Sequence, residues 1–442
     1  MTYQSYIAAH RFGLGASGGD MRGISQNPKG WLKAQIKSGT QTALVGSFKT
    51  TDEITRQVSK IKAAKQAERR KIIKQGVALY SDEMEARFQH AIKTETPLIE
   101  RLVMFWSNHF AVSFKGKPYI AGLMGAYERD AIRPHVLGKF SDMLRAVVEH
   151  PAMLVYLDNV QSFGPNSVVG KRRNRGLNEN LAREILELHT LGVDGGYSQK
   201  DVIAFAKILT GWTIKPPKQG GGGFEFIKYI HEPGDHVLLG KKYNQSNQAQ
   251  GIAALNDLAR HPSTARFIAT KMARHFIGDN PSKASIRKLE RTFINTDGDL
   301  RAMVDTLINM TEVWKNPLPK IKKPYEMVVS CFRLMDIPDN KIPFKRVAQS
   351  LALLDHLPFQ APSPKGWPDT TDDWLSPNAM MNRVEWCHAF AQIIRPKENP
   401  LDFARGAFGG VASADTLTWI ERAPSPVDGL ALMLASPEWQ RR

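Results

Sequence analysis

The stretch from residue 178 to residue 192 constrains the fold most, because its side chains repeat with the period of a helix. It opens on Asn178, a capping residue, and closes on Gly192, the residue type that commonly follows the last helical turn. Side chains three and four positions apart share one face of a helix. The apolar face here has two adjacent rows, which are Leu181, Ile185 and Leu188, and Ala182, Leu186 and His189. Two such rows predict a helix wedged between neighbours, with a narrow polar face left over.

The polar face of this predicted helix carries the first candidate site. It presents Asn180, Arg183, Glu184 and Glu187. Glu184 and Glu187 are three positions apart, which places their Cβ atoms about 5–6 Å from each other. Two carboxylates this close repel, so one of them keeps its proton to higher pH and can serve as a general acid. The same side chains could instead pair along the helix, Arg183 with Glu187 and Asn180 with Glu184.

The rest of the chain is typical of a mainly helical protein. Apolar residues recur with a helical period in residues 97–112, in residues 201–209 and in most segments after Gly251. Residues 213–243 differ, because the β-rich runs FEFIKYI and HVLLGKKY flank a Pro-Gly turn and predict a small hairpin. No internal repeat or low-complexity linker divides residues 1–442. We therefore expect a mainly α protein, one large multi-helical domain with a single β-hairpin insertion.

The charge balance favours anionic partners. The 442 residues carry a formal net charge of +17, which suits nucleic acid, an anionic glycan or a membrane surface. Much of the excess falls in residues 60–74 and 171–175. The first of these lies within residues 51–93, which we expect to form a basic helical arm on the surface. This arm lacks the interleaved aromatic residues that stack on bases and the bulky apolar row that enters lipid.

Targeting signals are not visible in the sequence. The sequence contains no run of about 18 apolar residues, which is the length that would predict a transmembrane helix. The opening residues, MTYQSYIAAHRFGLGASGGD, lack the basic and apolar regions of a signal peptide. The residues alone therefore predict a cytoplasmic protein.

Other polar residues near predicted helix ends and turns extend the candidate site. His109 ends the apolar segment 97–112 and is either a catalytic group or a hydrogen-bonded core residue. The candidates for substrate binding are Asn180, Arg183, Asn108, Asp158, Tyr197, Trp212 and Arg11. The basic loop at residues 161–177 leads directly into the acidic helix, so its side chains could lean over the same polar face.

Two histidines, His231 and His236, flank the predicted hairpin turn and are candidate metal ligands together with Glu232 and Asp235. The sequence Glu-Pro-Gly-Asp is also ordinary turn chemistry, and the spacing matches no common zinc pattern.

Eight motifs follow one another along the chain: HRFGLG, FWSNHFAV, HPAMLVYLDN, NENLAREILELHTLGVDGGYSQKDVIAFAKILTGW, HEPGDHVLLGKKY, HPSTARFIATKMARHF, TDGDLRAMV and SPKGWPD. In this order they resemble the bacterial domain of unknown function 1800 family. The resemblance implies a fold and not an activity. Members of this family are often exported and are often encoded beside a sulfatase-like family of unknown function (number 1501), which implies a functional link and work on envelope or extracellular glycans. The chain departs from the family pattern at Glu232, where many relatives carry Asp, and in lacking a visible signal.

Three functions follow from these features. The first is an enzyme that acts on an anionic or sugar-containing substrate with Glu184 and Glu187 as acid and base. The second is a haem- or metal-binding protein, because five of the twelve histidines are predicted in the core or at helix ends. These are His109, His135, His150, His189 and His275. The third is a non-catalytic binding module for nucleic acid or another anionic polymer, which rests on charge alone.

Overall fold

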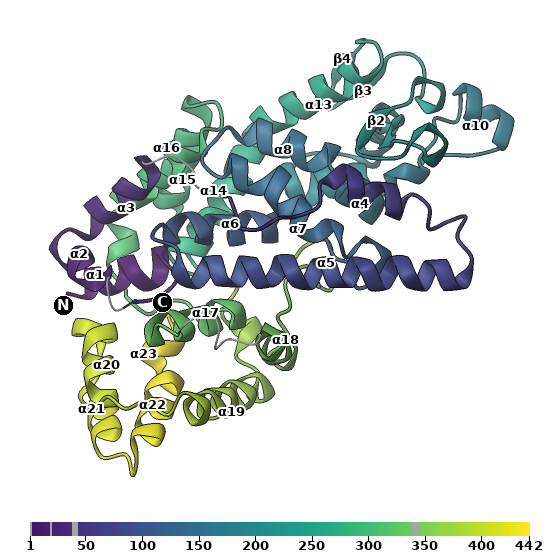
Figure 1. Ribbon diagram of the computed structural model, residues 1–442. Helices are drawn as coiled ribbons and strands as arrows, with labels where there is room; N and C mark the ends of the chain where they lie inside the picture. The colour runs from purple at the N-terminus through teal and green to yellow at the C-terminus, as the bar shows by residue number, and fades with distance from the viewer. Residues whose placement is uncertain (1, 18–19, 38–42, 338–343) are drawn as a thin grey trace.

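The structure is a computed structural model that describes residues 2–17, 20–37, 43–337 and 344–442 (Figure 1). Across these residues the chain is mainly helical (64%), with 23 α-helices and two small two-stranded sheets, which confirms the predicted fold class. The helices of the first half are α1 Tyr3–Tyr6, α2 Asp20–Gln26, α3 Pro28–Lys37, α4 Thr51–Val58, α5 Gln66–Lys93, α6 Pro97–His109, α7 Leu123–Tyr127, α8 Phe140–Glu149, α9 Pro151–Tyr156, α10 Val168–Arg173, α11 Asn180–Glu184 and α12 Gln199–Leu209. Those of the second half are α13 Gln248–Arg260, α14 Pro262–Phe276, α15 Lys283–Asn295, α16 Leu300–Asn309, α17 Pro324–Met335, α18 Phe344–Leu353, α19 Pro377–Ile394, α20 Pro400–Phe408, α21 Ala414–Glu421, α22 Pro426–Ala435 and α23 Pro437–Gln440.

Local sequence signals start and end several of these helices. The Ser198-x-x-Asp201 pattern forms a capping box, since each side chain bonds the other residue's backbone N–H at the start of α12. The helix predicted from residue 178 begins at Asn180 as α11 and continues as a π-helical turn, Ile185–Thr190. It ends before Gly192, whose positive φ of 86° is the conformation that glycine adopts most easily.

The insertion at residues 213–243 contains two separate hairpins instead of the one expected. β1 (Trp212–Ile214) pairs with β2 (Phe224–Phe226), and β3 (His236–Leu238) pairs with β4 (Lys241–Tyr243). The tight turn between β3 and β4 is Leu239-Gly240, and both of these residues have positive φ, as short hairpin turns require. The Pro-Gly turn therefore connects the two hairpins and does not close one.

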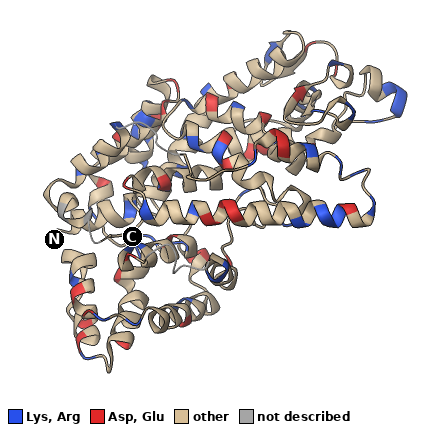
Figure 2. Ribbon diagram, in the orientation of Figure 1, with Lys and Arg blue, Asp and Glu red and all other residues tan. Residues whose placement is uncertain are grey.

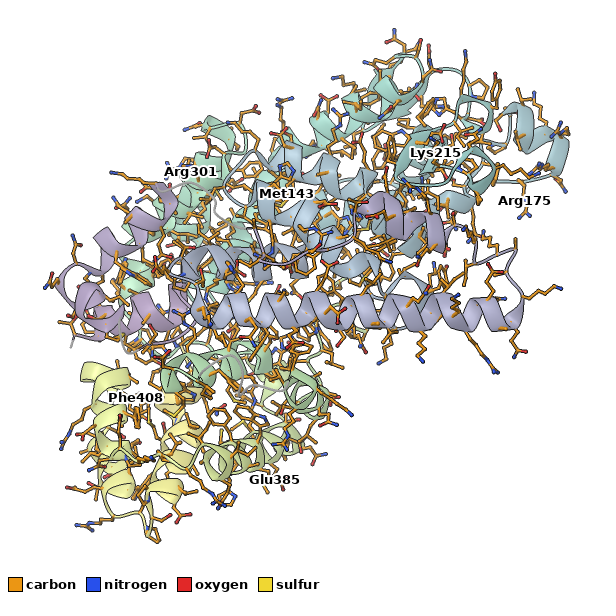
Figure 3. The ribbon with its side chains drawn as sticks, in the orientation of Figure 1. Met143, Arg175, Lys215, Arg301, Glu385 and Phe408 are labelled. Carbon is orange, nitrogen blue, oxygen red and sulfur yellow. The ribbon has the colours of Figure 1, made fainter. Side chains whose placement is uncertain are left out.

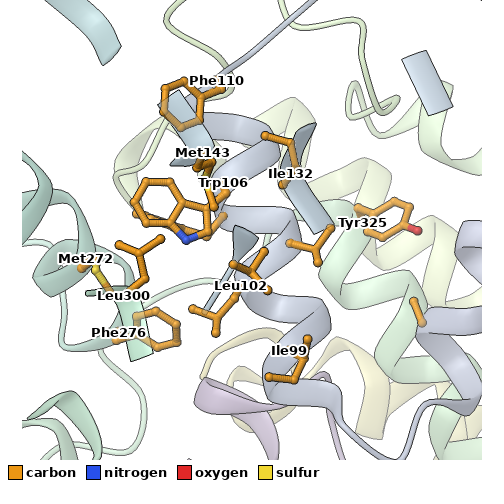
Figure 4. Packing of buried hydrophobic residues seen from close by; sticks show 14 of the residues in the cluster. Ile99, Leu102, Trp106, Phe110, Ile132, Met143, Met272, Phe276, Leu300 and Tyr325 are labelled. Atoms are coloured by element: carbon orange, nitrogen blue, oxygen red, sulfur yellow. The ribbon is translucent and has the colours of Figure 1, made fainter. Parts of the chain in front are cut away.

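The buried apolar side chains form one cluster that runs from Tyr6 to Trp439. Helix α6 contributes to its centre, where Leu102 and Trp106 face side chains of α14 and α16 (Figure 4). The long helix α5 crosses the molecule between the α1–α16 region and α17–α23 (Figure 1), and α17 packs on it. Within the described residues no helix is long and apolar enough to cross a membrane.

Candidate functional site

The predicted carboxylates lie together on one face of α11 and its π-helical turn. Tyr197 Oη lies 3.5 Å from Glu187 Oε2. Burial raises the pKa of Glu184, and the neighbouring Glu187 raises it further. Burial also raises the pKa of Tyr156 to about 12, with a further contribution from Glu184. The structure thus brings Glu184, Glu187 and Tyr197 close to one another.

The remaining predicted residues of this face have other environments. Arg183 Nη2 lies 3.0 Å from Glu179 Oε2 and donates a hydrogen bond to Gln199 Oε1, so it pairs one turn back along the helix. Asn180 is exposed. Asp158 forms an ion pair of 2.7 Å with Lys117.

Trp212 and Arg11 are both buried. Trp212 packs closely against Gly251. Arg11 donates hydrogen bonds to the backbone carbonyls of Val313 and Asn316. Both side chains therefore have structural contacts in the core.

The two candidate metal ligands of the insertion each form a hydrogen bond with the backbone, His231 with Thr210 and His236 with Glu232. His231 Nδ1 lies 2.8 Å from the carbonyl oxygen of Thr210. Glu232 accepts hydrogen bonds from Asn166, and Asp235 pairs with Lys242. Across the described ranges, no group of three or more His, Cys, Asp or Glu side chains is placed to hold a metal ion.

Asn108 connects α6 to the Pro- and Trp-rich segment that precedes α19. Its amide donates to the carbonyl of Trp367 (3.0 Å), and its oxygen accepts from the Trp367 N–H (2.8 Å). The neighbouring His109 is buried, with Nε2 3.1 Å from the His189 carbonyl, and burial lowers its pKa well below the ordinary value. Asn108 and His275, the latter predicted as a possible haem or metal ligand, both line the cavity described next.

This central cavity has a volume of about 80 Å³ and lies where five segments meet. A buried space needs roughly 10–15 Å³ to hold one water molecule, so this one has room for several waters or a small ligand. The lining residues come from α5, α6, α14, α17 and the segment between α18 and α19, and are Arg87, Met104, Phe105, Ser107, Asn108, Ala111, Val112, His275, Lys323, Tyr325, Glu326, His356, Pro358, Phe359, Ala361, Trp367 and Asp369.

Lysines surround Asp369 at one side of the cavity. Its carboxylate oxygens lie 3.3 Å from Lys323 Nζ and 3.3 Å from Lys271 Nζ. Lys320 donates to the Asp369 carbonyl (2.6 Å) and pairs with Asp279 (2.6 Å). Burial opposes ionisation of Asp369, but the three lysines outweigh it and hold its pKa below the ordinary value. Three ammonium groups therefore face two carboxylates, and one positive charge has no counter-charge within this group.

Two neutral histidines line the cavity. The backbone N–H of Tyr325 donates to His356 Nδ1 (3.0 Å), so His356 carries its proton on Nε2. His275 Nε2 is buried without a hydrogen-bond partner among the described residues. Burial lowers the pKa of both rings well below the ordinary value, and nearby positive charges, Arg442 beside His275 and Lys323 beside His356, act in the same direction. Both imidazoles are therefore uncharged near neutral pH.

Buried ion pairs hold the helices around the cavity. Glu326 on α17 lies 3.1 Å from Arg101 and 2.9 Å from Arg442. Burial raises the pKa of Glu326, but these two guanidinium groups outweigh it and lower the pKa to about 2.

A second group of ion pairs includes Arg87, which also lines the cavity. Glu128 binds Arg87 and Arg133 at 2.9 Å each, and it accepts a hydrogen bond from Ser107. Arg133 also pairs with Glu100. Breaking buried pairs of this kind is strongly destabilising, so these groups fix the geometry of the wall.

The cavity was not predicted as the site, although sequence signals for it exist. Its residues Trp367 and Asp369 lie in the SPKGWPD motif, and His275 ends the HPSTARFIATKMARHF motif. Lys323 and His356 carry no comparable signal, because only the tertiary fold brings them beside the others.

A profile of the family described as protein of unknown function (DUF1800) matches residues 7–441, nearly the whole chain. The chain belongs to the DUF1800 family. Among curated proteins and among solved structures, none matches this DUF1800 chain. Family membership therefore identifies the protein without assigning an activity to it.

Proposed function

We propose that this DUF1800 protein binds the anionic group of a small molecule, such as an acidic or phosphorylated sugar, in the central cavity. The observation that carries the proposal is the excess of one positive charge in the group of Lys271, Lys320, Lys323, Asp279 and Asp369. Lys323 of this group lines the cavity together with His356, whose Nε2 carries a proton. A neutral or cationic ligand would not balance this excess charge. A carboxylate, phosphate or sulfate can accept hydrogen bonds from Lys323 and His356 and balances the charge.

The apolar part of the wall supports a ligand with a flat, weakly polar face. The aromatic rings of Phe359, Trp367 and Tyr325 line the cavity. Trp367 and Trp374 pack against His356, with ring centroids 5.0 Å from it. Pockets that bind small molecules combine such aromatic walls with a few fixed polar groups. Asn108 uses both ends of its amide on Trp367 and so acts as a positioning residue for this wall.

The protonation states around the cavity favour binding over proton transfer. Glu326 and Asp369 have lowered pKa values and stay ionised, whereas His275 and His356 have lowered pKa values and stay neutral. A general acid or base works best with a pKa near the working pH. These four groups can hold and orient an anion but do not exchange protons readily near pH 7.

A thermal-shift measurement tests the proposal. Glucuronate, glucose 6-phosphate and glucose 6-sulfate are titrated against neutral glucose. At least one anionic sugar should raise Tm saturably, and glucose should not. Lys323→Gln should remove the shift, whereas Lys365→Gln, an exposed lysine of the same segment that does not line the cavity, should keep it. Equal shifts in both variants, or no shift with any anion, would refute the proposal.

A second candidate is an enzyme that uses Glu184 and Glu187. The raised pKa of Glu184 supports it, since a carboxyl group that holds its proton to higher pH can act as a general acid. This pair does not line the central cavity. Glu184→Gln and Glu187→Gln, tested separately on acidic oligosaccharides, should each lower turnover. Full activity in both folded variants would remove this candidate.

A further inference from the structure

Unpaired positive charge gathers at one end of the molecule. Residues 60–74, 171–175 and 215–218 carry thirteen lysines and arginines, all of them exposed, and Glu68 is the one acidic residue among them. We call these three segments the basic end. Figure 2 shows this charge at the start of α5 and on α10, and Figure 3 places Arg175 and Lys215 at the same end.

The insertion connects the three segments in space. Gly221, three residues after Lys218, lies so close to α4 that an added Cβ would be 3.2 Å from Arg56 and Ser59, and α4 leads directly into residues 60–74. The turn Lys228–Ile230 of the same insertion contacts α10. The basic end is thus one region built from distant parts of the chain.

The charges of the basic end have no counter-charges of their own. Among the described residues, no ion pair is found for any of the thirteen side chains. Arg69 also lies at the end of the first turn of α5, where the helix dipole disfavours positive charge. Arg70, Lys71 and Lys74 are exposed, whereas Ile72 and Gly76 are buried against the body. These cations therefore form no ion pair that stabilises the fold, and they are free to bind an external anion.

The side chains of the basic end restrict the partner's class. Residues 60–76 and 167–176 contain no aromatic residue, and the connecting turn Lys228–Ile230 adds the single exposed ring of Tyr229. Proteins that bind single strands stack successive bases on several such rings. Within residues 60–76 and 167–176, Val168 is the one exposed large apolar residue. One such side chain gives too little apolar surface for insertion into lipid. Exposed amides at Gln66, Gln75 and Asn174 suit hydroxyl groups.

We propose that the basic end binds a linear anionic polysaccharide, with sulfate or carboxylate groups on Arg69, Arg70, Lys71 and Lys74. The choice of a polysaccharide rests on the proposed function, in which the central cavity binds the same chemistry, the anionic group of an acidic sugar. A long polyanion bound at this surface would concentrate such units near the protein.

The test is the binding of fluorescent heparin to the full-length protein, measured by anisotropy at several salt concentrations. Arg69, Arg70, Lys71 and Lys74 are changed together to Gln, which keeps helix propensity. The matched control changes Lys283, Arg287, Lys288 and Arg291, four exposed and unpaired basic residues of α15, to Gln as well. Both variants lose the same charge. Circular dichroism and the unperturbed Tm confirm that each is folded.

The α5 variant should lose about tenfold or more of the heparin affinity and show a weaker salt dependence, and the α15 variant should stay within about twofold of wild type. Equal losses would show that overall charge is responsible and would overturn the proposal. Tighter binding of duplex DNA or of anionic lipid vesicles than of heparin, through the same α5 residues, would also overturn it. Trp367→Leu in the cavity should leave heparin binding unchanged, so the outcome is separate from that of the cavity ligand.

Discussion

The lysine at position 322 should make the protein less stable at neutral pH than a variant without its charge. Lys322 is 1% exposed, and its Nζ lies 4.1 Å from the centroid of the Trp439 ring and 3.4 Å from Ser330 Oγ. No carboxylate pairs with it among the described residues. Burial lowers its pKa from 10.5 to about 7.

The size of the effect follows from linkage. Each unit of pKa difference corresponds to about 1.4 kcal/mol, so keeping the charge inside the folded protein at pH 7 costs about 4 kcal/mol. A desolvated contact between an ammonium and an indole ring stabilises by about 2 kcal/mol and offsets part of this cost. Lys322→Met keeps the length of the side chain and its contact with Trp439. We therefore expect the variant to gain roughly 2 kcal/mol in free energy of unfolding at pH 7.

The pH dependence has a definite sign. Between the folded pKa near 7 and the unfolded pKa near 10.5, the unfolded chain holds the Lys322 proton and the folded chain has released it. Wild-type stability should therefore rise with pH in this window relative to Lys322→Met, and the difference between the two proteins should shrink. Urea unfolding of both proteins at pH 7, 8 and 9 measures it. A variant less stable than wild type at pH 7, with a constant difference across the range, would refute the reasoning.

Three further changes have clear expectations. Arg133→Met leaves the buried Glu100 without a guanidinium partner and Glu128 with Arg87 alone, and should cost about 3–5 kcal/mol, seen as a lower midpoint in urea. Retention of wild-type stability would contradict the role of the network. Gly125→Ala places a methyl group against the side chain of Glu83 and should cost about 1–3 kcal/mol in the same assay, so an unchanged midpoint would show that Glu83 can move aside. Glu187→Gln removes a neighbouring negative charge and should lower the pKa of Glu184, measured by carbon NMR of the carboxyl group; an unchanged value would show that burial alone raises it.

Much of the fold was predictable because helical periodicity and capping residues act over short distances. The capping box at Ser198 and Asp201 and the end of a helix before Gly192 are examples. The strand pairing in the insertion was harder to predict. The alternation of apolar and polar residues in FEFIKYI and HVLLGKKY is compatible with more than one pairing partner for each strand. The turn that closes the second hairpin is Leu239-Gly240, where both residues have positive φ. The Pro-Gly turn was the more prominent turn signal in the sequence, but it only connects the two hairpins.

The site was less predictable than the fold. The proximity of Glu184 and Glu187 follows from helix geometry, and their half-buried environment depends on Tyr156 and Tyr197 from other segments. The central cavity depends on contacts between residues far apart in sequence. Asn108 holds Trp367, which is 259 positions away, and no periodic pattern encodes such a contact.

The central claim is that the cavity beside Lys323 receives an anion, and a crystal soaked in bromide tests it most directly. Anomalous scattering locates bromide without assumptions about the natural ligand. We expect a bromide ion within the cavity, at hydrogen-bonding distance from Lys323 Nζ or His356 Nε2, and its loss in Lys323→Gln. A cavity that holds only water at bromide concentrations that label the exposed lysines of α5 would contradict the claim.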